Sequence, residues 1–201
     1  MALMLASDEI EQNLAGAWRL MLGKADGLRQ LDLSADGFWN SFFAILIAVP
    51  ALVVGWAGVS NDVALETATF ASRFGIVVRL AMVDIGAWVL PLIVLALVAP
   101  RVGIGDRFVH YVVASNWTSA IIAWLMLPAA LARMLFPAAD NVVSLLSLAV
   151  FALAMVFTWR MTNATIGKGA AIGSAVFAGM FFVSLLVLFG LQALFGIQLP
   201  A

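Results

Sequence analysis

The sequence predicts an all-α membrane protein: a polytopic bundle of five transmembrane helices, preceded by an amphipathic helix. Of the 201 residues, 65% are hydrophobic and 10% are charged, and the mean hydropathy is +1.11. Soluble domains are roughly 45–50% apolar and about 25% charged. A soluble fold of this composition would have too few polar residues to cover its surface. The charged residues also lie mostly between long uncharged stretches, which is typical of membrane spans.

Five of these stretches are long enough to cross a bilayer. A helix needs about 20 residues to cross roughly 30 Å of hydrocarbon. Residues 37–201 are therefore expected to form the transmembrane domain, with spans at about 38–59, 76–100, 108–132, 141–159 and 170–194. Few residues separate the third span from the fourth, and we expect a tight hairpin around Pro137. Pro128 is expected to kink the third span without ending it.

Residues 1–36 differ from the rest of the chain and are expected to form an amphipathic helix and a linker. Asp8 and Glu9 suit the positive end of a helix dipole, and Ser34 is expected to cap the first span. Two interpretations stay open: the helix lies on the membrane surface, or it packs on the bundle itself. Both use the same apolar stripe, which consists of Ile10, Leu14, Ala17, Trp18, Met21 and Leu22.

The basic residues are distributed unevenly between the two sides of the expected spans. Three lie on one side, namely Arg73, Arg79 and Arg133. Cytoplasmic loops carry an excess of Lys and Arg. We therefore expect a protein of the cell (inner) membrane with a cytoplasmic N-terminus and an extracytoplasmic C-terminus. The other seven basic residues would then be cytoplasmic: Arg19, Lys24, Arg29, Arg101, Arg107, Arg160 and Lys168.

Four tryptophans fall where an interfacial position is expected. Trp39 and Trp159 lie near the cytoplasmic ends of their spans, and Trp56 lies near an outer end. Trp18 belongs to the stripe of the N-terminal helix. Tryptophan is enriched at both membrane–water interfaces. Three deeper tryptophans are expected to pack within the bundle: Trp88, Trp117 and Trp124.

Asp84 is the first candidate functional residue. An ionisable side chain inside a span is costly, which makes it a functional hypothesis by default. Asp84 would bind a proton or a cation in a transport cycle. The alternative is a structural role, with Arg79 or polar groups of the third span as its partner. Arg79 can instead extend to the outer interface.

The third span carries a polar cluster at residues 115–119. Asn116 and Ser119 share a helix face, and Thr118 lies between them. Such residues commonly hydrogen-bond to neighbouring helices. The alternative is a pore or substrate lining that Asp84 faces. His110, near the cytoplasmic end, would shuttle a proton or bond to a carbonyl or water at the interface.

Small residues mark the beginning of the fifth span. They allow close packing within the bundle or between protomers. The expected packing residues are Gly169, Gly173, Ser174 and Ala178.

Several classes of function receive no support from the sequence. The chain has no cysteine and a single histidine, and its net charge is −1. We therefore expect no metal site, no cofactor, no nucleic-acid partner and no enzymatic activity. The expected partners are the lipid bilayer and other membrane proteins, including further copies of this chain.

The layout resembles the bacterial branch of the Yip1-like membrane proteins. Residues 13–22 (NLAGAWRLML) form a short lead, and five closely spaced spans follow. Eukaryotic members are associated with small GTPases and vesicle traffic, and they carry Asp-Leu-Tyr-Gly-Pro and Gly-Tyr signatures. Neither signature occurs here, so no functional residue is carried over. The resemblance implies a scaffold or trafficking-type protein, and the alternative is a small oligomeric transporter or channel component that uses Asp84.

Overall fold

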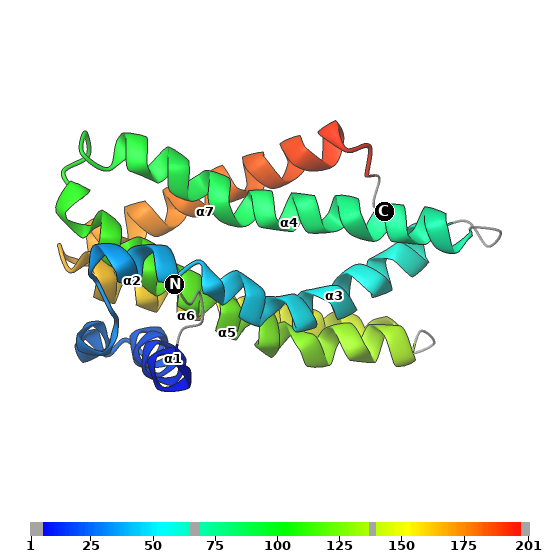
Figure 1. Cartoon of the computed structure of the whole chain (residues 1–201), viewed down its shortest axis with the longest axis horizontal. Helices are drawn as coiled ribbons and strands as arrows, with labels where there is room; N and C mark the ends of the chain where they lie inside the picture. Colours follow the sequence, from blue (N-terminus) through cyan, green and yellow to red (C-terminus); the bar gives the residue numbers. More distant parts are fainter. Residues whose placement is uncertain (1–5, 65–68, 137–139, 198–201) are drawn as a thin grey trace.

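The computed structural model describes residues 6–64, 69–136 and 140–197, and all its regular structure in these ranges is helical (Figure 1). Two short 3-10 helices, η1 (Ala25–Gln30) and η2 (Gly105–Arg107), lie in connections. The α-helices of these ranges are α1 (Ser7–Met21), α2 (Ala35–Asn40), α3 (Phe43–Val63), α4 (Phe70–Val98), α5 (Phe108–Leu135), α6 (Asp140–Ile166) and α7 (Ala170–Leu194).

The expected fold class is confirmed, because five helices are long and apolar enough to cross a membrane. The third and fourth spans are separate helices, α5 and α6, and α5 continues through Pro128 to Leu135. The expected hairpin at Pro137 lies outside the described residues. The clearest differences from expectation are that α4 begins at Phe70, that α6 runs to Ile166, and that the first span is divided into α2 and α3.

The division of the first span follows from local hydrogen bonding. Ser34 caps α2 as expected, since its hydroxyl accepts from the Gly37 N–H at 3.0 Å. The Ser41 hydroxyl then donates to the Phe38 carbonyl at 2.7 Å. The Ser41 hydroxyl thus occupies the Phe38 carbonyl of α2 shortly before α3 begins at Phe43.

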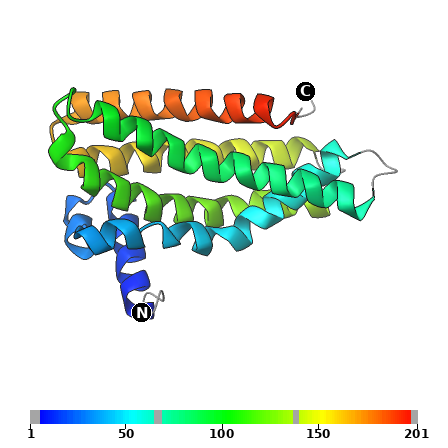
Figure 2. The same cartoon turned by 45° about the horizontal axis from the view of Figure 1, so that its top comes forward.

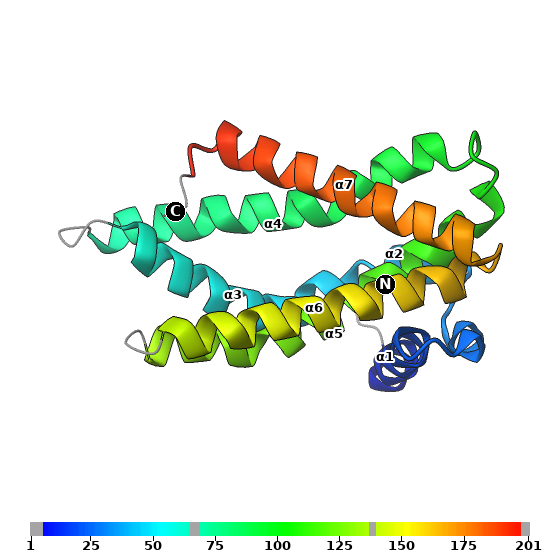
Figure 3. The ribbon, with the colours of Figure 1, turned by 180° about the vertical axis from the view of Figure 1, so that it is seen from behind.

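The five spans contact one another in a closed ring. Neighbouring pairs are α3 with α5, α5 with α6, α6 with α7, α7 with α4, and α4 with α3. Figures 1 and 3 show two layers, one containing α3, α5 and α6 and the other containing α4 and α7. The end of the bundle where α1 packs, called the α1 end below, holds the connections at 99–107 and 167–169. The opposite end holds the last turns of α3 and α5 and the first turns of α4 and α6.

The N-terminal helix α1 runs across the spans near the α1 end (Figure 2) and packs on α5 and α6. Its residues Ala17, Leu20 and Met21 are completely buried. Ala17 and Met21 of the apolar stripe therefore pack on the bundle, whereas Trp18 and Leu22 are exposed, and the acidic residues of the first turn face outward. At 1.5 Å per residue, α5 is about 42 Å long, which exceeds the hydrocarbon thickness of about 30 Å. The surplus length gives α1 a place to pack.

Two glycines let α1 and η1 approach closely. A Cβ on Gly27 would lie 2.4 Å from the Gly16 carbonyl oxygen. Arg19 of α1 also pairs with Asp26 of η1, and this hydrogen bond holds the pKa of the Asp26 carboxyl below its usual value. Exposed ion pairs contribute little to stability, so the glycine contact is the stronger constraint.

We predict that Gly27→Ala lowers the stability of the protein by about 1–3 kcal/mol, because the added methyl group meets backbone rather than a movable side chain. Thermal unfolding in detergent measures this. Gly55→Ala is the matched control, since nothing lies within 4 Å of its Cβ position in α3. The control should be neutral or slightly stabilising. Equal melting temperatures for the two variants would contradict the close contact.

Candidate functional site

Asp84 of α4 is bound to α3 rather than to the polar cluster of α5. The Trp56 indole N–H donates to the Asp84 carboxylate at 2.6 Å. Trp56 is only 7% exposed, and its interfacial position stays a prediction. Its N–H is used within the bundle, because hydrocarbon offers that donor no other partner. Arg79 is exposed, and no ion pair joins it to Asp84 among the described residues.

Asn116 connects three helical segments. The Trp88 indole N–H donates to its side-chain oxygen at 2.9 Å, and its amide nitrogen donates to the Ser41 hydroxyl at 2.9 Å. Asn116 and Ser41 are both completely buried. These two hydrogen bonds connect α4 to α5, and α5 to the junction of α2 and α3. Asn116 thus bridges helices through one donated and one accepted hydrogen bond.

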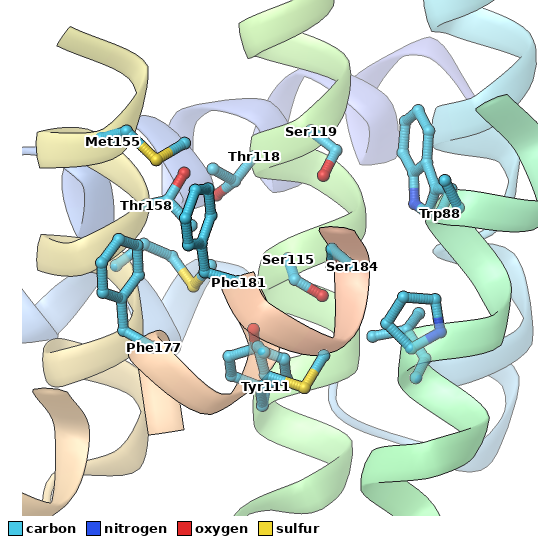
Figure 4. A pocket seen from close by; sticks show the side chains of 15 residues that line it. Trp88, Tyr111, Ser115, Thr118, Ser119, Met155, Thr158, Phe177, Phe181 and Ser184 are labelled. Atoms are coloured by element: carbon cyan, nitrogen blue, oxygen red, sulfur yellow. The ribbon is translucent and has the colours of Figure 1, made fainter. Parts of the chain in front are cut away.

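A cavity of about 290 Å³ lies between α4, α5, α6 and α7 (Figure 4). Its wall is mainly apolar, with Trp88, Phe177 and Phe181 among the larger side chains. None of its 15 described lining residues is charged. Hydroxyl groups come from three helices, and their residues are Tyr111, Ser115, Thr118, Ser119, Thr158 and Ser184.

Thr118 has unused hydrogen-bonding capacity in this wall. Ser115 and Thr158 donate to carbonyls of their own helices, at 3.1 and 2.8 Å. Tyr111 is hydrogen-bonded to Thr162. Thr118 is 1% exposed, yet its hydroxyl has no partner among the described residues. Buried polar groups are nearly always bonded, so each exception requires an explanation.

The structure separates the polar residues that the sequence grouped together. Thr118 and Ser119 line the cavity, whereas Asn116 bridges helices. Asp84 is not among the lining residues. His110 is half-buried in the first turn of α5, and its Nδ1 has no described partner. It does not line the cavity either.

The small residues at and near the beginning of α7 also differ in their roles. Gly173 packs on α6, where an added Cβ would lie 2.3 Å from the Asn163 side-chain oxygen. Ser174 accepts a hydrogen bond of 2.9 Å from the Trp159 indole. Gly169 precedes α7 with φ of +93°, and no described atom lies within 4 Å of its Cβ position, so it makes no close packing contact within the described part of the chain. It serves the turn, while Ala178 is exposed.

The other tryptophans differ in exposure, and the interfacial positions of Trp18, Trp39 and Trp159 stay predictions. Trp39 is exposed on α2. Trp18 and Trp159 are partly exposed, and Trp18 makes an edge-to-face contact with Phe157 of α6. Trp124 donates to the Ile47 carbonyl at 2.9 Å and so joins α5 to α3.

Sequence reasoning missed the cavity residues outside the polar cluster. Thr158 and Ser184 lie in apolar surroundings on α6 and α7, and Met180 gives no polar signal. A lone hydroxyl in a span is common, because it bonds to its own helix. Only the positions of four helices bring these residues together.

Comparison of the chain with protein-family models, with curated proteins and with solved structures finds no match. No family model therefore supports the resemblance to Yip1-like proteins, which stays a hypothesis about layout. The comparisons leave the residues themselves as the basis for any functional argument.

We predict that Asp84→Leu is less stable than Asp84→Asn by about 1–2 kcal/mol, because only asparagine keeps an acceptor for the Trp56 N–H. Thermal unfolding in detergent compares the two variants. Adding Trp56→Phe to each should remove the difference. A difference that persists without the indole would show that Trp56 is not the partner that matters.

Proposed function

We propose that this integral membrane protein binds a small neutral molecule taken from the bilayer and acts as a small carrier or channel component. The observation that carries the proposal is the cavity between α4, α5, α6 and α7 with its unpartnered Thr118 hydroxyl. Ligand sites are concave and mainly apolar, with a few polar groups that fix orientation. The cavity has this character.

The lining determines the class of ligand. A charged ligand in an apolar cavity needs a partner charge, because burying an unpaired charge costs too much free energy. The described wall has no charged side chain, and hydroxyls both donate and accept hydrogen bonds. A neutral molecule with hydroxyl or ester groups fits this wall. We propose no enzymatic activity, because the cavity combines no nucleophile with a base.

Asp84 has a structural role in this proposal. Its carboxylate accepts from Trp56 at 2.6 Å and does not line the cavity. The version of the transporter hypothesis that places Asp84 beside Thr118 is therefore replaced by one that depends on hydroxyl groups. Coupling to a proton or cation through Asp84 is not part of it.

We predict that Thr118→Val weakens binding of monooctanoylglycerol, used as a neutral hydroxyl-bearing probe, by roughly fivefold, the equivalent of one hydrogen bond of about 1 kcal/mol. Native mass spectrometry of the protein released from micelles measures the retained probe. Thr165→Val is the matched control, because Thr165 is also buried and unpartnered but does not line the cavity. Binding that is unchanged in Thr118→Val, or equally weak in both, would refute the proposed site.

A scaffold or trafficking-type function is the second candidate. Part of the apolar stripe of α1 packs on the bundle, and the helix presents outward an acidic face that includes Asp8 and Glu11. Basic residues gather at the α1 end, which favours a cytoplasmic location for this face. Such a surface fits a protein partner better than a membrane.

We predict that a photoreactive residue at Glu11 crosslinks to a discrete protein in native membranes, because Glu11 is exposed on the acidic face of α1. The same residue at Ser144, which is exposed on α6, should crosslink to lipid. Gel analysis of the adducts separates the two results. Lipid adducts alone at both positions would argue against a docking role for α1.

A further inference from the structure

A second cavity adjoins the first and has a different character. It measures about 390 Å³ and lies between α4 and α7 towards the α1 end. All its described lining residues are apolar or glycine, among them Val98, Ile172 and Gly179. The hydroxyl-lined cavity and this apolar cavity share Met180.

The apolar cavity reaches the outer surface of the bundle. Val98 and Ile172 are both more than 40% exposed on its rim. The parts of α4 and α7 that line it belong to helices long and apolar enough to cross a membrane, so we infer that hydrocarbon lies beside the cavity. A hydrocarbon chain can enter from the bilayer without passing through water.

Met180 stands where the two cavities meet. Methionine is unbranched and flexible, and it adapts its shape to irregular spaces. Its side chain can move aside without breaking a hydrogen bond. A molecule that spans both cavities would pass Met180, with its polar part beside Thr118 and its apolar part beside Gly179.

We propose that the ligand is a neutral single-chain lipid with a hydroxyl-bearing headgroup, whose head lies in the hydroxyl-lined cavity and whose tail lies in the apolar cavity. This inference rests on the proposed function and names its substrate class. The head is neutral because the wall near Thr118 has no charge to pair with it. The tail is a single chain because one apolar cavity continues from the hydroxyl-lined one.

Gly179 offers a selective test of the tail position. Nothing lies within 4 Å of its Cβ position, so Gly179→Leu fits and places a side chain in the apolar cavity. Gly190→Leu is the matched control, because Gly190 also lies on α7 in open space and lines neither cavity. Both variants receive the same residue in the same helix.

The probes are monooctanoylglycerol and monopalmitoylglycerol, which have the same head and different tails. We expect Gly179→Leu to weaken binding of the palmitoyl lipid about tenfold and to leave the octanoyl lipid nearly unchanged. Each buried methylene contributes about 0.8 kcal/mol, so excluding two of them accounts for this loss. Gly190→Leu should bind both lipids like the unmodified protein. Native mass spectrometry and competition in micelles give the affinities.

The outcomes separate this inference from the function it depends on. If Gly179→Leu and Gly190→Leu bind the palmitoyl lipid equally, the tail does not lie beside Gly179, and the inference fails. The proposed function survives that result provided Thr118→Val still weakens octanoyl binding. If the unmodified protein binds neither lipid, both fail. Ionised palmitate that competes as well as the neutral lipid would overturn the headgroup assignment.

A crosslinking experiment locates the tail directly. A monopalmitoylglycerol with a diazirine at the tail end should label the stretch of α7 that lines the apolar cavity, between Ile172 and Val183. Gly179→Leu should reduce this labelling and Gly190→Leu should not. Labelling spread evenly over the exposed faces of α6 and α7 would show ordinary bilayer contact and overturn the proposal.

Discussion

Hydrocarbon offers no hydrogen bonds, so a polar group within a span of this bundle needs a partner on its own helix or on a neighbouring one. Two indole N–H groups meet that need across the layers. Trp56 of α3 donates to Asp84 of α4, and Trp88 of α4 donates to Asn116 of α5. The Asn116 amide nitrogen in turn donates a hydrogen bond to the Ser41 hydroxyl. These bonds hold the layer of α4 and α7 against the layer of α3, α5 and α6.

The bundle contains two kinds of packing. At the α1 end, the first turns of α5 and the last turns of α6 are buried beneath α1, much like the core of a soluble protein. Elsewhere the helices expose large apolar side chains such as Leu145 and Phe182. The first region resembles an interior and the second has lipid as its outer layer. The surplus length of α5 explains why one helix can belong to both.

The central cavity follows from the course of α7. Near its beginning this helix packs on α6 through Gly173, and near its end Leu191 packs against Gly86 of α4. Because α7 leans from one neighbour to the other, it leaves space beside the middle of α5. Thr118 lies in that space with its hydroxyl unpartnered. A buried polar group without a partner requires an explanation, and the proposed function explains the Thr118 hydroxyl by its place in the wall of the cavity.

The sequence by itself determined the class of the protein, the number of its spans and most of their bounds. Transfer of a helix into hydrocarbon depends on the length and composition of that helix alone, so local residues suffice to predict it. They did not predict that Trp56 is buried on Asp84, that Asn116 and Thr118 have different roles, or that Gly173 packs while Gly169 turns the chain. Each of these depends on which helix faces which, and only the ring of α3, α5, α6, α7 and α4 decides it. A hydrogen bond between residues 28 positions apart is a property of helix order, and no local pattern records that order.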